Sequence, residues 1–356
     1  MREIWSGRAD EAERAVLGRH VRRLWALPGT ALGVVSHPAT PSSRLFARWD
    51  YWWQAHLLDC AVDAFDRSPS RERRALVAAV VRGHHVRNGG RWGNDYFDDM
   101  AWLGLALQRA DEVVGVRQPA AVAELTRTLH GAWSDEAGGG VPWRRGDDFR
   151  NVPANGPTAI LLARTGDVVR AEATAGWIDE RLLDPATGLV LDGLRPGGVL
   201  ETTVYTYNQG VVLGAETELA VRTDAPVHAE RVHRLVAAVA ERLATDDVLH
   251  THRGGDGGLF SGILARYLAL VARALPGTGE ADEQARTTAT RLVLRSARSV
   301  WAHRAQTPDG AVFGHDWTVP ARVPRPGGDE PERDLSVQLG AWMLLEAAAR
   351  VCDEPV

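Results

Sequence analysis

Helical periodicity repeats along this chain and constrains its fold more than any other feature of the sequence. Apolar residues recur at spacings of three and four along almost the whole length, whereas strand alternation is scarce. Breakers such as Pro28-Gly29, Ser68-Pro69 and Pro276-Gly277 separate the periodic segments. The pattern predicts about twelve helices, at 7–27, 45–67, 70–87, 97–115, 118–134, 154–165, 167–183, 207–222, 226–245, 259–275, 281–304 and 334–352.

The predicted helices alternate between two kinds. Every second helix, beginning with the one at 7–27, has one apolar face and one arginine-rich face, as expected of an outer layer. The others carry little charge and contain small residues, as in AWLGLALQRA, which indicates that protein surrounds them. Alternating outer and inner helices predict an all-α fold, an (α/α)6 barrel of six helical hairpins. Closed barrels often reach this length as one unit, so we expect a single domain over residues 1–356.

Polar and aromatic residues gather at or just before the N-termini of the predicted inner helices. Trp52, Asp98, Asn155, Tyr207 and Phe260 represent them, and follow one another at steps of 46, 57, 52 and 53 residues. A step of about fifty residues matches one helical hairpin with its loops. Parallel inner helices would bring these N-termini together around one mouth of the barrel. Carboxylates, amides and aromatic rings there predict a carbohydrate site, because sugar hydroxyls need polar partners and pyranose faces stack on aromatic rings.

The adjacent carboxylates Asp98 and Asp99 are the strongest candidates for catalysis. An Asp pair before an apolar helix is commonly just an N-cap followed by a first-turn acid. Here the flank NDYFDD adds Asp95 and two aromatic rings to the same turn, and the helix belongs to the inner set. Two neighbouring carboxylates repel each other, so one pKa rises and that group keeps its proton. The pair then supplies an acid and a base from one residue type.

Four segments of the chain resemble, in order, the signature blocks of glycoside hydrolase family 76, the endo-α-1,6-mannanases. They are YWWQAHLLD, YFDDMAWLGLAL, YTYNQG and FSGILARYL, and the resemblance covers roughly residues 45 to 345. It implies an (α/α)6 barrel and a retaining mechanism without metal or organic cofactor, with Asp98 as nucleophile and Asp99 as general acid/base. Retention requires carboxyl groups ~5–5.5 Å apart. Adjacent residues at a helix start meet that requirement if the first lies outside the regular helix.

Residues around the YTYNQG block are candidates for substrate binding. Tyr207, Asn208 and Gln209 open an inner helix, where amides are suited to holding hydroxyls beside the reacting carbon. Asn208 could equally cap the helix, and the sequence leaves both roles open. Asp192, in GLVLDGL, resembles an acid that precedes this block in the family and is a third candidate carboxylate. Its alternative is an ordinary Asp-Gly turn residue.

Further substrate-binding candidates lie in the other blocks. Trp52, Gln54 and His56 form an aromatic-polar patch with Trp53, although one of the two tryptophans is expected to pack in the core. Trp143, Asn151 and Asn155 resemble the family's glycine-rich loop leading into an asparagine-bearing helix. Phe260 and Trp317 are candidate stacking platforms.

The sequence departs from the family pattern at several positions. Val141-Pro142 precedes Trp143 where paired tryptophans are expected, and Ser261 stands where the family has lysine. Pro153 and Pro157 stiffen the asparagine-bearing segment. These changes concern the rim and the subsites rather than the Asp pair, so they bear on linkage and chain-length preference more than on catalysis.

Charge and cysteine content narrow the possible partners. The formal net charge is −5, and all 41 basic residues are arginines interspersed with acids, which argues against nucleic-acid binding. The two cysteines, Cys60 and Cys352, form no CxxC motif, and no histidine pair has a carboxylate or cysteine at a familiar metal-ligand spacing. The N-terminus lacks the apolar stretch of a signal peptide, and no apolar run approaches the ~20 residues that span a bilayer. We therefore expect a cytoplasmic protein without membrane contact, unless a leader has been removed; the oligomeric state is left open.

The sequence thus supports one leading function and two alternatives. The leading one is a retaining glycoside hydrolase that cleaves α-mannosidic linkages, α-1,6 in particular, in mannan or manno-oligosaccharides. A transglycosylase or a hydrolase of another glycoside on the same barrel is the second, and a non-catalytic carbohydrate-binding barrel is the third. The Asp98–Asp99 pair argues against the third.

Overall fold

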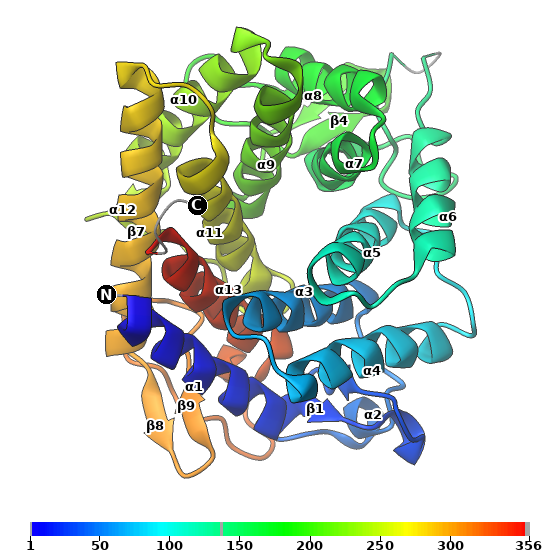
Figure 1. The fold of residues 1–356 in the computed structure, drawn as a ribbon, viewed down its shortest axis with the longest axis vertical. Coiled ribbons are helices and arrows are strands. Elements are labelled where there is room, and N and C mark those ends of the chain that lie inside the picture. The colour runs from blue at the N-terminus through cyan, green and yellow to red at the C-terminus, as the bar shows by residue number, and fades with distance from the viewer. Residues whose placement is uncertain (1, 136–137, 353–356) are drawn as a thin grey trace.

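The computed structural model describes residues 2–135 and 138–352, and its core is a double ring of helices (Figure 1). The six inner helices are α3 (Tyr51–Arg67), α5 (Phe97–Arg109), α7 (Val152–Thr165), α9 (Thr206–Thr223), α11 (Gly257–Ala274) and α13 (Leu335–Val351). The six outer helices are α1 (Arg2–His20), α4 (Arg71–Arg87), α6 (Pro119–His130), α8 (Val168–Leu182), α10 (Pro226–Arg242) and α12 (Glu280–Ala302). Each inner helix contacts the next one, and α13 contacts α3, so the inner ring closes. The predicted all-α barrel of alternating inner and outer helices is confirmed.

Short elements occupy the loops between these helices. One further helix is the single turn α2 (Pro41–Arg44). Tight 3-10 turns cover Leu24–Ala26, Pro196–Gly198 and Pro331–Arg333, and a wider π-helical turn covers Ala110–Val114. The strands are β1 (Val21–Arg22), β2 (Leu32–Gly33), β3 (Arg150–Asn151), β4 (Gly193–Arg195), β5 (Val199–Glu201), β6 (Ala244–Thr245), β7 (Val248–Leu249), β8 (Ala305–Thr307) and β9 (Gly310–Val312). Strands β3, β4 and β5 form one antiparallel sheet, in which Asn151 faces Gly193 and Gly193 faces Glu201. The sequence did not predict this sheet, which places loop residues beside the start of α7.

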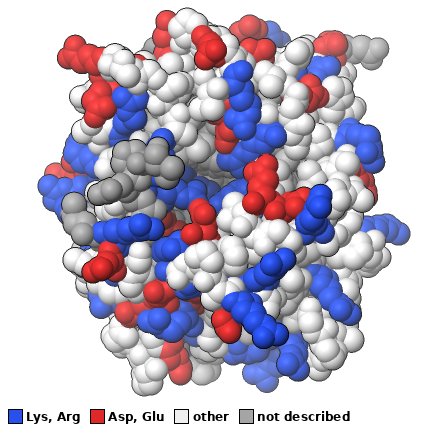
Figure 2. All heavy atoms as spheres, viewed as in Figure 1, with Lys and Arg blue, Asp and Glu red and all other residues white. Residues whose placement is uncertain are grey.

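Small residues allow the inner helices to approach one another closely. A methyl group added at Gly340 of α13 would collide with the carbonyl oxygen of Gly258 in α11, and one at Gly262 would lie 2.6 Å from the carbonyl oxygen of Gly340. Helix α11 is also long and apolar enough, by length and composition alone, to cross a membrane. Its packing between α9 and α13 inside the ring accounts for that apolar character. On the surface, acidic side chains and arginines are interspersed over the face shown in Figure 2.

Three predicted helix boundaries differ from the observed ones by about six residues or more. The first helix was expected to reach residue 27 but ends at His20, because Val21 and Arg22 pair with the strand at Leu32–Gly33. The second was expected from residue 45 but begins at Tyr51, since Phe46 and Asp50 have φ angles of 55° and 45°, outside the α-helical region.

The third error concerns the predicted helix at 97–115. Regular α-helix stops at Arg109 and gives way to a π-helical turn over Ala110–Val114. Gly115, at a φ of 71°, then ends the helical segment.

Candidate active site

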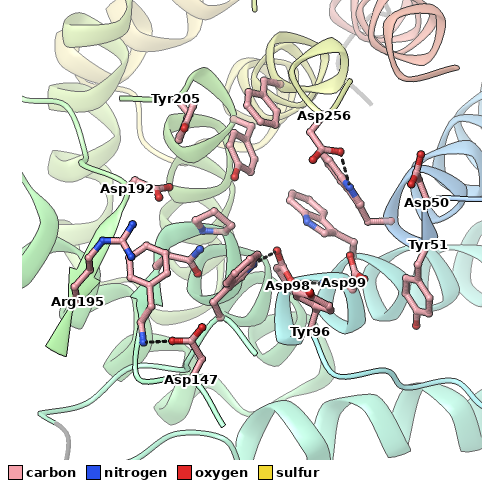
Figure 3. Close-up of a pocket in the computed structure, with 18 residues that line it drawn as sticks. Asp50, Tyr51, Tyr96, Asp98, Asp99, Asp147, Asp192, Arg195, Tyr205 and Asp256 are labelled. Atoms are coloured by element: carbon pink, nitrogen blue, oxygen red, sulfur yellow. Dashed lines mark hydrogen bonds between the residues drawn. The ribbon is translucent and has the colours of Figure 1, made fainter. Parts of the chain in front are cut away.

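A cavity of about 640 Å³ opens where the N-termini of the inner helices meet (Figure 3). Its lining consists mainly of carboxylates and aromatic rings, and comprises Asp50, Tyr51, Trp52, Tyr96, Asp98, Asp99, Trp102, Trp143, Asp147, Phe149, Asn151, Pro153, Asp192, Arg195, Tyr205, Tyr207, Asp256 and Phe260. In Figure 3 the acid pair lies at the start of α5, with Asp192 and Arg195 on one side and Asp50 and Asp256 on the other. The arrangement has the concave shape and the polar groups of a saccharide site.

Asp98 and Asp99 occupy the first turn of α5, and each has its own hydrogen-bond donors. Asp98 Oδ1 accepts the backbone N–H of Asp99 at 2.9 Å, and Asp98 Oδ2 accepts the indole N–H of Trp143 at 3.0 Å. Asp99 Oδ2 accepts the side-chain amide of Asn94 at 2.6 Å. Tyr96 is the N-cap residue, so neither aspartate caps the helix. The condition set from the sequence for the carboxyl separation, that the first aspartate lie outside the regular helix, is not met, since α5 already begins at Phe97.

The environments of the two aspartates separate their proton affinities. Burial raises the pKa of Asp98 to about 6, although the backbone N–H of Asp99 and the Trp143 indole oppose the rise. Burial and the charge of Asp98 hold the pKa of Asp99 well above its usual range, and Asp256 and Asp50 add to the effect. Asp99 therefore keeps a proton under conditions in which Asp98 has lost its own, which gives an acid beside a base.

Aromatic rings from four inner helices, α3, α5, α9 and α11, form a wall of the cavity. The rings of Tyr207 and Phe260 stack with centroids 4.0 Å apart and planes 16° apart. Trp52 lies between this stack and Trp102, with centroids 6.4 Å from Phe260 and 6.5 Å from Trp102. Tyr205 adds an edge contact to Phe260 at 5.4 Å. These rings supply flat apolar surface in the cavity that holds the acid pair, as a pyranose ring requires.

Residues 9–341 match the family model described as glycosyl hydrolase family 76. The chain belongs to glycoside hydrolase family 76. It is 25% identical over 312 residues to a mannan endo-1,6-α-mannosidase of Candida glabrata, a match that covers 75% of this chain and 67% of the relative. The solved GH76A α-1,6-mannanase of Salegentibacter sp. HEL1_6 is 27% identical, with a TM-score of 0.85 and coverage of 98% of this chain and 99% of that one.

An inactive variant of the Salegentibacter enzyme, with two consecutive aspartates replaced by asparagine, has been solved in complex with α-1,6-mannotriose. It is also 27% identical, with a TM-score of 0.84 and the same coverage of both chains. Membership of the family makes the present protein a glycoside hydrolase.

In this family 76 enzyme, the cavity brings together eight of the fifteen predicted site residues: Asp98, Asp99, Trp52, Trp143, Asn151, Asp192, Tyr207 and Phe260. Asp192 is more than an Asp-Gly turn residue, because its buried carboxylate faces the cavity and accepts a hydrogen bond from Asn208 at 3.0 Å. The remaining seven are not among the lining residues: Gln54, His56, Asp95, Asn155, Asn208, Gln209 and Trp317.

Three of these seven residues have buried side-chain amides that hydrogen-bond the backbone of neighbouring loops. Gln54, Asn155 and Gln209 each accept a backbone N–H and donate to the carbonyl of the same loop residue, with distances of 2.7–3.0 Å. Gln338 near the start of α13 does the same to Phe313. The amides thus fix the loops that surround the cavity.

The other four residues outside the lining lie beside the cavity, on the surface or in the core. Asn208 neither caps α9, whose N-cap is Tyr205, nor lines the cavity, but donates to Asp192. His56 packs behind the wall, 4.6 Å from Trp102, and burial lowers its pKa to about 3. Asp95 is exposed, and Trp317 is buried in the core with its carbonyl bonded to Ser299.

Sequence reasoning missed several lining residues. Asp50 and Asp256 directly precede α3 and α11, so the pattern that identified Asp98 could have found them. Asp147, in a loop, and Arg195, at the end of the short strand β4, carry no recognisable signal. Arg195 pairs with Glu201 at 2.9 Å and lies 4.6 Å from the Phe149 ring centre, so its charge is already partly compensated. Among the described residues, no group of three His, Cys, Asp or Glu side chains is arranged to hold a metal ion.

Proposed function

We propose that this family 76 enzyme is a retaining α-mannosidase that cleaves α-1,6 linkages in mannan or manno-oligosaccharides. The observation that carries the proposal is the pair of adjacent carboxylates, differently hydrogen-bonded, in one cavity with a set of aromatic rings. The named activities of the Candida and Salegentibacter relatives supply the linkage. The mannotriose complex of a variant lacking two consecutive aspartates supports the assignment to an aspartate pair.

The proposed mechanism assigns one task to each aspartate. Asp98, ionised and held by Trp143, attacks the anomeric carbon, while Asp99 donates its proton to the departing glycosidic oxygen. This forms a covalent glycosyl–Asp98 ester and releases the leaving sugar. Asp99, now ionised, removes a proton from water, which attacks the same carbon and frees Asp98. Two displacements at one carbon retain its configuration.

Other lining residues are proposed to hold the sugar. Asp192, oriented by Asn208, is suited to accept hydrogen bonds from the hydroxyl groups of the reacting mannose. Trp52 and the Tyr207–Phe260 stack offer flat surfaces for pyranose rings. Together these contacts would position the anomeric carbon against Asp98, which is how an enzyme turns binding energy into rate.

The experiment is incubation of the purified protein with α-1,6-mannobiose, -mannotriose and -mannotetraose, with the products followed by proton NMR. We expect cleavage in which the α-anomer of the new reducing end appears first and then equilibrates. A first product in the β form would refute retention, and no cleavage of any of the three saccharides would refute the α-1,6 assignment. Asp246→Asn is a matched control, because Asp246 also belongs to a pair of adjacent aspartates but is exposed in the turn between β6 and β7.

A further inference from the structure

Asp256 is a cavity residue whose role the proposed mechanism leaves open. It directly precedes α11, yet its side chain makes no capping hydrogen bond. Instead its Oδ1 accepts the indole N–H groups of Trp52 at 3.1 Å and Trp53 at 2.9 Å. Because consecutive helical residues point in directions about 100° apart, one oxygen that bonds both indoles fixes the start of α3 against the start of α11.

The bond to Trp52 matters because of where that ring lies. Trp53 is fully buried and would be held by packing alone, whereas Trp52 is only partly buried and lines the cavity. The neighbours of the Trp52 ring are His56, Trp102 and Phe260, with centroids 5.4, 6.5 and 6.4 Å away. None of these contacts is a hydrogen bond, so Asp256 is the group that sets the rotation of the indole.

The charge of Asp256 faces the catalytic pair. Its side chain is exposed at the cavity wall, and it raises the pKa of both Asp98 and Asp99. Asp50, at the start of α3, and Tyr51 also face Asp99, while Asn94 donates to it and Trp143 donates to Asp98. Arg48 compensates Asp50 at 3.2 Å.

We propose that Asp256 is a positioning residue of this enzyme: its Oδ1 fixes Trp52 as a platform for the sugar, and its carboxylate adds negative charge to the cavity that holds Asp98 and Asp99. The inference rests on the proposed function, because it assumes that Asp98 and Asp99 carry out the reaction. Two substitutions separate the two effects. Asp256→Asn keeps an oxygen that can accept both indole N–H groups but removes the charge, whereas Asp256→Ala removes both.

The first test is the pH dependence of kcat/KM for Asp256→Asn. Asp98 must be ionised and Asp99 protonated, so their pKa values set the acidic and alkaline limbs respectively. Loss of a nearby negative charge lowers both values, so the whole profile should move to lower pH by a few tenths of a unit. The shift should shrink in 1 M salt, because Asp256 is exposed to solvent and salt screens its charge.

The second test is the KM of Asp256→Ala at the pH optimum. We expect KM to rise about 10-fold, the loss typical of one hydrogen bond that orients a binding group, while Asp256→Asn stays within about 2-fold of the wild type. Thermal unfolding of both variants checks that the fold is intact, and Asp246→Asn is the charge-loss control.

A pH profile of Asp256→Asn that coincides with that of the wild type, or an unchanged KM in Asp256→Ala, overturns the proposal. The failure of the proposed function is recognised separately, by wild-type enzyme that leaves α-1,6-mannosides intact. In that case the carboxyl ¹³C resonance of Asp99, titrated in wild type and Asp256→Asn, still reports whether Asp256 raises its pKa.

Discussion

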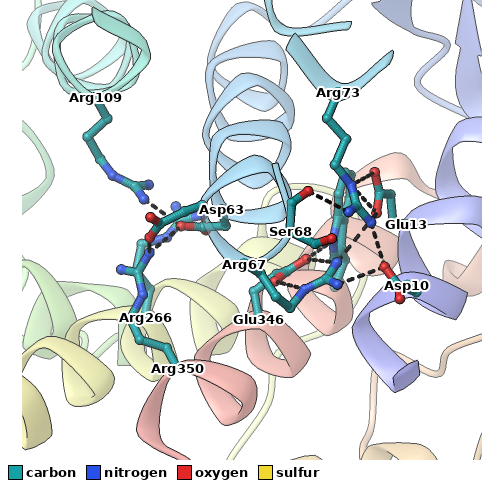
Figure 4. Close-up of polar contacts among 12 residues, drawn as sticks. Asp10, Glu13, Asp63, Arg67, Ser68, Arg73, Arg109, Arg266, Glu346 and Arg350 are labelled. Carbon is teal, nitrogen blue, oxygen red and sulfur yellow. Dashed lines mark hydrogen bonds and ion pairs between the residues drawn. The ribbon is translucent and has the colours of Figure 1, made fainter. Parts of the chain in front are cut away.

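The two ends of the inner helices surround their buried carboxylates with different partners. At the end that forms the cavity, carboxylates face one another and burial raises the pKa of Asp98, Asp99 and Asp192. At the other end, carboxylates face arginines (Figure 4). There burial is outweighed by Arg109, Arg266 and Arg350, and the pKa of Asp63 is lowered.

Helix polarity explains why the charges divide in this way. All six inner helices carry an arginine in the last turn: Arg67, Arg109, Arg164, Arg222, Arg273 and Arg350. Cations are favourable at helix C-termini and anions at N-termini, and parallel inner helices add these preferences around the ring. The difference teaches that the same helix dipoles serve chemistry at one end and stability at the other, because Asp98 and Asp99 accept hydrogen bonds from neutral donors, whereas Asp63 is paired with arginines.

The largest expected effect comes from the cavity end. Asp98→Asn and Asp99→Asn should each lower kcat by about 10³-fold or more, since one removes the nucleophile and the other the acid/base. Initial rates on α-1,6-mannotriose measure the loss, with Asp246→Asn as the control. A kcat equal to that of the wild type in either variant would show that the replaced aspartate has no catalytic role.

Arg266 tests the opposite end. It binds Asp63 at 2.6 Å and also contacts Asp59, with its side chain only 10% exposed. Arg266→Met should lower the free energy of unfolding by about 3 kcal/mol, because it leaves buried carboxylates undercompensated. Urea denaturation measures this, and the exposed ion pair of Arg117 with Asp111 supplies the control, since Arg117→Gln should cost less than about 0.5 kcal/mol. A stability loss no larger than the control, or a matching loss of kcat in the folded variant, would contradict the division of roles.

The sequence predicts the fold more completely than it predicts the site. The fold was predictable, because helical periodicity and the alternation of charged and uncharged helices both follow from burial. The ends of helices were harder. The positive φ angles of Phe46 and Asp50 and the pairing of β1 with β2 depend on tertiary contacts that leave no local pattern.

Site residues at the starts of helices were predictable from the sequence, whereas site residues elsewhere were not. Asp98, Tyr207 and Phe260 were found because each begins an inner helix. Asp147 precedes, and Arg195 ends a strand of, a sheet whose two- and three-residue strands are too short to show alternation. The amides of Gln54, Asn155 and Gln209 hydrogen-bond loop backbone outside the cavity lining, and the sequence could not show this because a buried loop contact and a hydroxyl ligand call for the same residue type.

Stability as a function of pH should separate the two ends further. Asp98 and Asp99 have raised pKa values when folded, so between about pH 4 and 6 the folded state binds more protons and stability falls as pH rises. Asp63 has a lowered pKa, so its contribution is present above about pH 4 and is lost as pH falls below that. Changing both Asp98 and Asp99 to Asn should therefore remove the decline above pH 4 and add about 1–3 kcal/mol at pH 7, while leaving acid unfolding intact. Urea denaturation from pH 3 to 7 measures both limbs, and a double variant less stable than wild type at pH 7 would contradict the prediction.

The smallest expected effect comes from Asn208, whose neutral amide orients the carboxylate of Asp192. At the arginine end Asp63 is fixed by cations, whereas Asp192 in the cavity is fixed by the neutral amide of Asn208 at 3.0 Å. An amide orients the carboxylate while leaving its charge available to sugar hydroxyls, so Asn208→Ala should lower kcat/KM by about 5-fold, the value of one neutral hydrogen bond. The substitution should also raise the pKa of Asp192, because the amide stabilises the ionised form.

A double-mutant cycle that combines Asn208→Ala with Asp192→Asn provides the control. If Asn208 acts through Asp192, the double variant should lose little more kcat/KM than Asp192→Asn alone. Fully additive losses would mean that Asn208 supports the helix rather than the carboxylate, and that orientation by a neutral donor is not what distinguishes this end of the ring.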